Sequence, residues 1–128
     1  MKTKQVIVLR KDLNMRKGKM VAQGAHASMK VFFDRVEYCD HGEMKINGIT
    51  PQMDVWINGL FTKVCVSVNS EDELLAVYEQ AKMLGIPCSI IQDAGLTEFG
   101  GINTYTAVAV GPDDAEIIDS VTGNLKLL

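Results

Sequence analysis

The side chains best suited to chemistry in the first third of the chain form a regularly spaced polar stripe. Lys19, Gln23, His26 and Lys30 follow one another at steps of four, three and four residues, so on a helix they share one side. Lys19 would lie in the first helical turn, where the helix dipole disfavours a cation. A base placed against that preference indicates a binding task. The alternative is an ordinary exposed face with His26 hydrogen-bonded at its edge, and the spacing alone does not decide between the two.

A second candidate is the segment Asp93-Ala94-Gly95, which directly follows an apolar run ending at Gln92. In open α/β sheets, ligands bind beyond the carboxyl ends of parallel strands, and a carboxylate placed there can act as a general base or orient water. Asp93 could equally close an Asx-turn before Gly95. Thr97, in the same loop, is a better functional candidate than Thr104 or Thr106, because threonines in strands usually serve β propensity.

Common catalytic and metal-binding patterns do not fit this sequence. Gly18-Lys19 is followed by Met rather than Ser or Thr, and no Gly-x-Ser-x-Gly segment occurs. The three cysteines are Cys39, Cys65 and Cys88. Their odd number and wide spacing argue against a disulfide framework and against a zinc site. Because Cys65 and Cys88 lie in apolar, strand-like runs, we expect both to be buried core thiols.

Charge is distributed very unevenly along the chain. The formal net charge of −3 argues by itself against a nucleic-acid partner. Residues 1–35, however, hold nine basic and two acidic side chains, a net charge of +7, whereas the remaining segment is at −10. Such asymmetry can create a local positive field on an acidic protein. Chance clustering on a solvated face explains the charges equally well.

The first half of the chain predicts one strand and one long helix. Gln5–Leu9 is a β-branched run typical of a strand, and residues 18–38 have helical periodicity. The apolar positions Ala22, Ala25, Met29, Phe32 and Val36 follow steps of three and four, so we expect them to form the buried face. Gly24 costs the helix about 1 kcal/mol relative to Ala, which predicts close approach by another backbone. Residues 39–59 predict a loop, with a hairpin turn possible at Asn47-Gly48.

The second half alternates strands and helices. Strands are expected at 60–68, 88–91 and 104–110, the last ended by Gly111-Pro112. A helix between the first two is capped by Asn69 or Ser70 and stopped by Gly85. One helical turn is expected within residues 113–120, followed by a short apolar tail. This order predicts an α/β fold with helices covering a mostly parallel sheet, in one domain spanning residues 1–128.

Four ordered blocks of the sequence resemble the type 2 peptidyl-tRNA hydrolase family. The opening segment, residues 8–27, is similar to a signature that runs Arg-x-Asp-Leu, Met, Gly-Lys, Ala-Gln and His-Ala. Residues 91–97 resemble the family's strand followed by Asp-Ala-Gly-x-Thr, and residues 106–112 resemble its Thr, apolar strand and Gly-Pro. Residues 118–128 resemble its closing Val-Thr-Gly and Leu-Lys-Leu-Leu. The resemblance covers most of the chain outside residues 39–59.

This resemblance implies a three-layer α/β/α sandwich with a mixed four-stranded sheet, and hydrolysis of the ester between a peptide and the terminal ribose of tRNA. By motif, the active-site positions are Lys19, Gln23, Asp93, Thr97 and Thr106. We hypothesise that Asp93 activates or orients the attacking water with help from Thr97, and that Lys19 stabilises the oxyanion or holds a nearby phosphate. Gln23 and Thr106 would hold the substrate in position. Further substrate-binding candidates, including the signature histidine, are His26, Arg10, Lys17 and Lys30.

The expected partner is tRNA, bound by the basic segment with an affinity that falls as salt rises. We expect no metal or organic cofactor, and a homodimer is possible because family members often form one. The apolar run Val6–Leu9 is too short for a signal peptide, and no stretch approaches a membrane span, which predicts a cytoplasmic protein.

Two other functions stay open at this point. One is a catalytically silent relative that serves as a protein-interaction module, with residues 39–59 as its contact surface. The other is a hydrolase of a different ester or amide.

Overall fold

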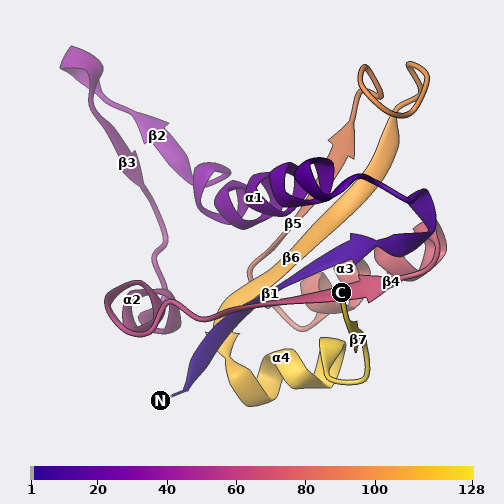
Figure 1. Ribbon diagram of the computed structural model, residues 1–128. Helices are drawn as coiled ribbons and strands as arrows, with labels where there is room; N and C mark the ends of the chain where they lie inside the picture. The colour runs from indigo at the N-terminus through magenta and orange to yellow at the C-terminus, as the bar shows by residue number, and fades with distance from the viewer. Residues whose placement is uncertain (1) are drawn as a thin grey trace.

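A five-stranded mixed sheet lies between two layers of helices (Figure 1). The computed structural model describes residues 2–128. In chain order the main elements are β1 (Thr3–Arg10), α1 (Lys17–Phe33), β2 (Val36–Tyr38), β3 (Met44–Ile46), α2 (Pro51–Asn58), β4 (Lys63–Val68), α3 (Glu71–Met83), β5 (Cys88–Asp93), β6 (Thr104–Asp114), α4 (Ala115–Thr122) and β7 (Lys126–Leu127). The α/β class and the three-layer sandwich are therefore confirmed.

The sheet differs from the expectation in strand direction and number. Its order is β5-β6-β1-β4-β7, and in the described part of the chain only β1 and β4 pair in parallel. The pairs β1/β6, β5/β6 and β4/β7 are antiparallel. The mixed sheet is confirmed, whereas the predicted parallel majority is wrong because β6 runs between β5 and β1 in the opposite direction. The carboxyl ends of β1, β4 and β5 nevertheless point to the same edge, which keeps Asp93 at the edge where ligands were expected.

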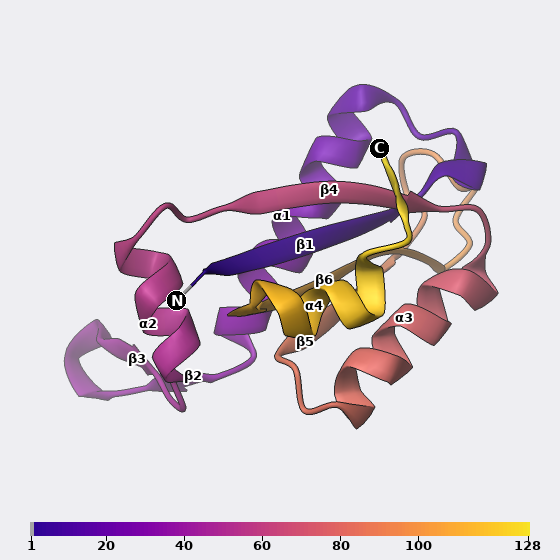
Figure 2. The ribbon, with the colours of Figure 1, turned by 90° about the horizontal axis from the view of Figure 1, so that it is seen from below.

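Two apolar clusters fix the helices to the two faces of the sheet. Alternate residues of β1 enter different clusters, as the two-residue period of a strand requires. Val6 and Val8 pack with Leu74 of α3 and Ile118 of α4, whereas Ile7 and Leu9 face α1 and α2. Figure 2 shows α3 and α4 lying together on the near side of the sheet, with α1 beyond it. Within residues 2–128, no helix is long and apolar enough to cross a membrane.

The buried face of α1 is not the face that its apolar periodicity predicted. Its buried residues are Gln23, Gly24, Ala27 and Val31. Ala22, Ala25 and Met29 are exposed, so the predicted apolar face is wrong for these three positions. The reason is that the small residues Gly24 and Ala27 pack against side chains of the sheet, while hydrogen bonds with Thr106 and Asp93 satisfy the buried Gln23. Near Gly24 the closest neighbour of an added Cβ is a side-chain atom of Ile7 at 3.4 Å, so the expected close backbone approach is also absent.

Residues 34–59 hold more regular structure than the predicted loop. Helix α1 ends at Phe33 rather than near Tyr38, because the chain turns into a hairpin of β2 and β3. The hairpin turn lies between these strands, around residues 39–43, so the predicted turn at Asn47-Gly48 is wrong. Helix α2 follows, with the Thr50 hydroxyl accepting a bond from the Met53 N–H and Pro51 in its first turn.

Three smaller expectations near the end of the chain also change. Strand β6 continues to Asp114 through the cis peptide Gly111-Pro112, which does not end it. Helix α4 is longer than the predicted single turn. Cys65 is exposed and Cys88 is half-buried, so neither is the expected buried core thiol. Cys65 is exposed because it lies in an open groove between the sheet and α1.

Candidate active site

Five side chains from α1, the end of β5, the β5–β6 loop and β6 form one connected polar cluster. Lys19 Nζ donates to Asp93 Oδ1 at 3.0 Å and to Thr97 Oγ1 at 2.8 Å. Gln23 Nε2 donates to the same carboxylate oxygen at 3.3 Å. Thr106 Oγ1 donates to Gln23 Oε1 at 2.5 Å. The structure therefore brings together Lys19, Gln23, Asp93, Thr97 and Thr106, although more than 60 residues separate the two parts of the chain.

The cluster has a solvent-facing half and a buried half. The side chains of Lys19 and Asp93 are 13% and 18% exposed, and Thr97 is exposed. Gln23 and Thr106 are buried, with exposed fractions of 2% and 0%. A ligand from solvent can therefore reach the first three groups. Thr106 instead holds Gln23, so we assign it a positioning role in place of the expected substrate contact.

The charge environment keeps Asp93 ionised. Burial raises the pKa of its carboxyl group, but the hydrogen bonds from Lys19 and Gly95, the charge of Lys19 and the bond from Gln23 together lower that pKa below its ordinary value. A carboxylate offers about four lone-pair positions, of which Lys19, Gln23 and Gly95 occupy three. The arrangement leaves one position on Oδ2 for a water molecule.

The Gly95 backbone fixes the carboxylate from the loop side. Its N–H donates to Asp93 Oδ2 at 2.8 Å, so the Asx-turn considered as an alternative is present together with the cluster. Gly95 has φ +76°, and an added Cβ would collide with the Ile102 backbone. Only glycine fits this turn without strain.

Sequence reasoning missed one neighbour of the cluster. The Phe99 ring lies 5.6 Å from Lys19 Nζ, within reach of a cation–π interaction. Phe99 could have been identified as the aromatic residue of the Gly-rich loop that follows Asp93.

The remaining predicted substrate-binding residues lie outside the cluster. Arg10 is held by Asp12 at 2.7 Å and by the Tyr105 carbonyl at 3.1 Å. Lys30 pairs with Asp34 at 2.6 Å. His26 and Lys17 are exposed, and within residues 2–128 neither side chain makes a hydrogen bond or ion pair. The expected hydrogen bond of His26 at the edge of the helix is therefore absent.

Comparison with known sequences decides the family. The sequence model of the family described as peptidyl-tRNA hydrolase PTH2 matches residues 3–128. The chain belongs to the peptidyl-tRNA hydrolase PTH2 family. A protein named peptidyl-tRNA hydrolase from Methanocaldococcus jannaschii is 46% identical over 98% of this chain and 99% of its own length. A protein of the same name from Sulfolobus acidocaldarius is 39% identical, with the same coverage of both chains. The resemblance stated from four motifs is thereby confirmed, and the enzyme class is that of a hydrolase acting on an ester bond.

A solved structure also shares the fold of this PTH2 family member. It is a protein of unknown function from Agrobacterium tumefaciens, with a TM-score of 0.59 and 15% sequence identity. The superposition covers 100% of this chain and 98% of the other. At this identity the likeness concerns the fold alone.

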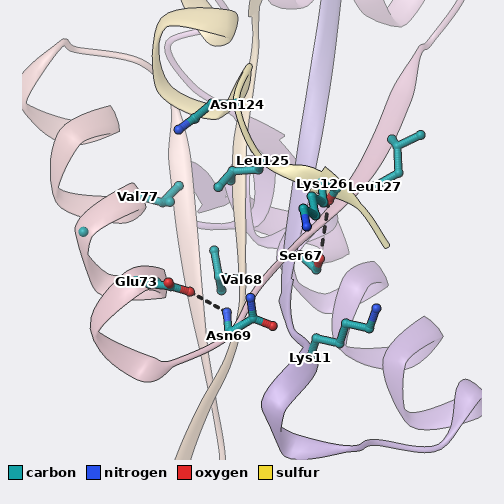
Figure 3. A pocket seen from close by; sticks show the side chains of 11 residues that line it. Lys11, Ser67, Val68, Asn69, Glu73, Val77, Asn124, Leu125, Lys126 and Leu127 are labelled. Atoms are coloured by element: carbon teal, nitrogen blue, oxygen red, sulfur yellow. Dashed lines mark hydrogen bonds between the residues drawn. The ribbon is translucent and has the colours of Figure 1, made fainter.

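A separate hollow of about 530 Å³ in this PTH2 family member lies between β4, α3 and the C-terminal strand. Figure 3 shows Lys11, Asn69, Asn124 and Lys126 around it, with the Glu73 carboxylate accepting from the Asn69 N–H. None of the cluster residues lines this hollow. Within residues 2–128, no three His, Cys, Asp or Glu side chains gather in a way that could hold a metal ion. The polar cluster of Lys19, Asp93 and Thr97 is therefore the candidate active site.

Proposed function

We propose that this cluster hydrolyses the ester between a peptide, or an N-blocked amino acid, and the 3′-terminal ribose of tRNA, which releases free tRNA. The observation that supports the proposal most directly is the position of the Lys19 ammonium between Asp93 and Thr97, at 3.0 and 2.8 Å. An ammonium ion, an ionised carboxylate and a hydroxyl at one solvent-reachable point can orient water and stabilise the oxyanion in ester hydrolysis.

In the proposed reaction Asp93 orients the attacking water. The water oxygen forms a bond to the ester carbonyl carbon, and its proton moves toward the remaining lone pair of Asp93 Oδ2. Because its pKa is lowered, Asp93 is a weak base, so we assign it orientation of the water ahead of full proton removal. Thr97 Oγ1 accepts from Lys19, which leaves its own proton to bond the water or the substrate.

Lys19 is proposed to stabilise the oxyanion. Its ammonium has three donors, and Asp93 and Thr97 accept from two of them. The third can reach the carbonyl oxygen as negative charge develops there. When the carbon–oxygen bond to the ribose breaks, the ribose oxygen leaves and takes up a proton, so that a free carboxylic acid and a free hydroxyl result.

Recognition of tRNA is assigned to the basic N-terminal segment. Lys30 and His26 lie on the same side of α1 as Lys19, by the steps of four and three residues that separate them. Lys17 and Arg10 are further candidates, although the bonds of Arg10 to Asp12 and Tyr105 restrict it. Contacts of this kind to phosphates make affinity fall as salt rises.

We propose in addition that residues 1–128 act as one domain in the cytoplasm. The family match over residues 3–128 and the shared sheet support one domain. We also propose a homodimer. The exposed apolar residues Val21 and Met29 on α1, at 73% and 54% exposure, support an interface there.

The test is turnover of an N-acetylated aminoacyl-tRNA by the wild-type protein, Asp93→Asn and Lys19→Ala. We expect release of free tRNA by the wild type and a fall in kcat of about 10²–10⁴-fold in each variant. Asp72→Asn, an exposed carboxylate on α3, is the matched control and should keep the wild-type rate. Wild-type rates in both cluster variants would remove these residues from the mechanism. A protein that binds the tRNA without turnover would instead be an interaction module.

A further inference from the structure

Helix α1 has two functional flanks. Lys19 and Gln23 lie on the flank that faces Asp93. Val21 and Ala25 lie on the other flank, where they line an apolar groove of about 400 Å³. The remaining residues of this groove, which we call the α1 groove, are Ile7, Leu9, Lys17, Met20, Gly24, Cys65 and Leu128. Val21 is 73% exposed, so the groove presents apolar surface to solvent.

A second unpartnered apolar surface lies on the hairpin of residues 36–46, which we call the arm. Its strands β2 and β3 form a two-stranded sheet of their own and project away from the rest of the molecule (Figure 1). Tyr38 pairs with Met44 in the ladder, two residues beyond the pair of Val36 and Ile46, so these four side chains share one face. At the outer end Tyr38 is 83% and Met44 51% exposed. The inner pair, Val36 and Ile46, is half-buried, so the outer pair is the apolar surface that the arm leaves open to a partner.

The charges of the arm and of the α1 groove indicate what that partner is. The arm carries Glu37, Asp40 and Glu43 against one lysine. An acidic arm repels the phosphates of tRNA. The groove is apolar and is bordered by the exposed Lys17, and Arg16 directly before it is 90% exposed although it lies 3.7 Å from Glu98. Apolar surface with acidic neighbours on the arm therefore complements apolar surface with basic neighbours at the groove.

We propose that the arm of one copy of this chain docks in the α1 groove of a second copy. This inference rests on the proposed homodimer and specifies its contacts. We place α1 across the two-fold axis, because its exposed Val21 and Met29 support an interface there. In an isologous dimer the two copies of a helix that crosses the axis at a right angle run antiparallel. The arm follows the C-terminal end of α1 after Phe33. It therefore falls beside the N-terminal half of the partner's α1, and Lys17, Met20 and Val21 of the groove lie in that half.

Symmetry makes the contact reciprocal, so each dimer holds two docked arms. Tyr38 and Met44 supply the apolar side chains, and Val21 and Ala25 supply the surface that receives them. Because the groove and the polar cluster occupy opposite flanks of α1, docking leaves Lys19 and Asp93 open to the tRNA.

Native cysteines provide the test. Cys39 lies at the outer end of β2 and Cys65 in the α1 groove, and both are exposed and free. A short bis-maleimide reagent should link Cys39 of one copy to Cys65 of the other and give a dimer-sized band, with the linked peptides identified by mass spectrometry. Cys39→Ser and Cys65→Ser should each abolish this link. Cys88→Ser, on β5, is the matched control and should retain it.

Sedimentation measures the same contact without a reagent. The double variant Tyr38→Ser/Met44→Ser should weaken the dimer at least tenfold in Kd, while hydrolysis per active site is kept. Lys45→Ser, on the opposite face of the arm, should leave Kd unchanged. A dimer without the Cys39–Cys65 link, and with wild-type Kd in the double variant, overturns arm docking and leaves the homodimer standing. A chain that is monomeric at all concentrations overturns both, whereas the hydrolysis proposal is tested separately by turnover. A raised KM for tRNA in the double variant without a change in Kd would assign the arm to RNA and also overturn docking.

Discussion

Asp93 experiences two opposing influences on its carboxyl group, and their balance is testable. Burial raises its pKa, while Lys19, Gly95 and Gln23 lower it, and the lowering wins. Replacing Lys19 by Met removes a hydrogen bond and a charge but keeps burial. We therefore expect the pKa of Asp93 to rise in Lys19→Met, with the midpoint of its carboxyl ¹³C NMR titration moving to higher pH. Lys82→Met on α3 is the control, and an unchanged Asp93 midpoint in Lys19→Met would contradict the assignment.

The same balance sets how Asp93 contributes to stability. A carboxyl group whose folded pKa lies below its unfolded value stabilises the folded state above the unfolded pKa. That contribution is lost as the pH falls through the folded value. In Lys19→Met the folded pKa rises, so part of the stabilisation that wild type has at neutral pH is missing. In denaturant unfolding, the deficit of the variant relative to wild type should be largest at neutral pH and should shrink as the pH falls through the range in which Asp93 becomes protonated.

Thr106 offers a prediction about positioning. Thr106→Val keeps the shape of the side chain but leaves the buried Gln23 Oε1 without its donor. An unsatisfied buried acceptor costs about 1–3 kcal/mol of unfolding free energy, and hydrolysis should slow because Gln23 no longer holds Asp93. Chemical denaturation and turnover measure the two effects. Thr104→Val on the same strand, whose hydroxyl bonds only the Ile102 carbonyl, should change neither by a comparable amount. If Thr106→Val and Gln23→Leu were fully additive in a double-mutant cycle, the coupling would be disproved.

Among the helices, α1 gives a prediction about Gly24 that differs from the one the sequence suggests, because within residues 2–128 no backbone of another element lies close to this glycine. An added Cβ would lie 3.4 Å from Ile7 Cγ2, which is ordinary contact. Gly24→Ala should therefore raise the unfolding free energy by about 0.5–1 kcal/mol, because alanine is the better helix former. Gly95→Ala should lower stability and activity, since its Cβ meets the Ile102 backbone. Thermal unfolding of both variants is the measurement, and a destabilised Gly24→Ala would show that α1 cannot move from Ile7.

The sequence predicted the positions of most elements well, because local signals determine them. The hydroxyl of Ser70 caps α3 and Gly85 follows its end, as expected. The phase of α1 was wrong because the sequence offers two apolar stripes, and the exposed one is the more hydrophobic. Which stripe is buried depends on how the whole chain packs, and in a single copy of the chain the groove beside Val21 faces solvent. Local periodicity cannot distinguish a stripe buried in the fold from one available to a partner.

The direction of β6 was a second limit of sequence reasoning. The loop of residues 94–103 connects neighbouring antiparallel strands β5 and β6. A parallel pair would need a crossover of about a dozen residues or more, usually with a helix. The sequence analysis predicted parallel strands from the alternation of strands and helices. That alternation stops before the last two strands, β5 and β6, which have no helix between them and pair antiparallel. The polar cluster, by contrast, was predictable from motif, since its contacts depend on side chains that the signature names.

For the whole molecule, the two flanks of α1 separate two kinds of surface. The flank of Lys19 and Lys30 carries the polar cluster, and the flank of Val21 and Ala25 carries the α1 groove. An acidic protein with a basic first third can bind tRNA only where its bases are not neutralised by their own acids. Lys30 is a base that is neutralised in this way, because Asp34 holds its ammonium at 2.6 Å.

Removing that acid should strengthen substrate binding. Asp34→Asn frees Lys30 to contact a phosphate, so we expect KM for the charged tRNA to fall and its dependence on salt to steepen. Each added phosphate contact changes the slope of log affinity against log salt by about 0.9 for duplex and about 0.7 for single strands. Turnover across a salt series measures this, with Glu79→Gln on α3 as the control for total charge. Asp34→Asn combined with Lys30→Ala should lose the gain. If the single and double variants show the same steepened slope, the added contact is not made by Lys30, and the tRNA does not follow this flank of α1.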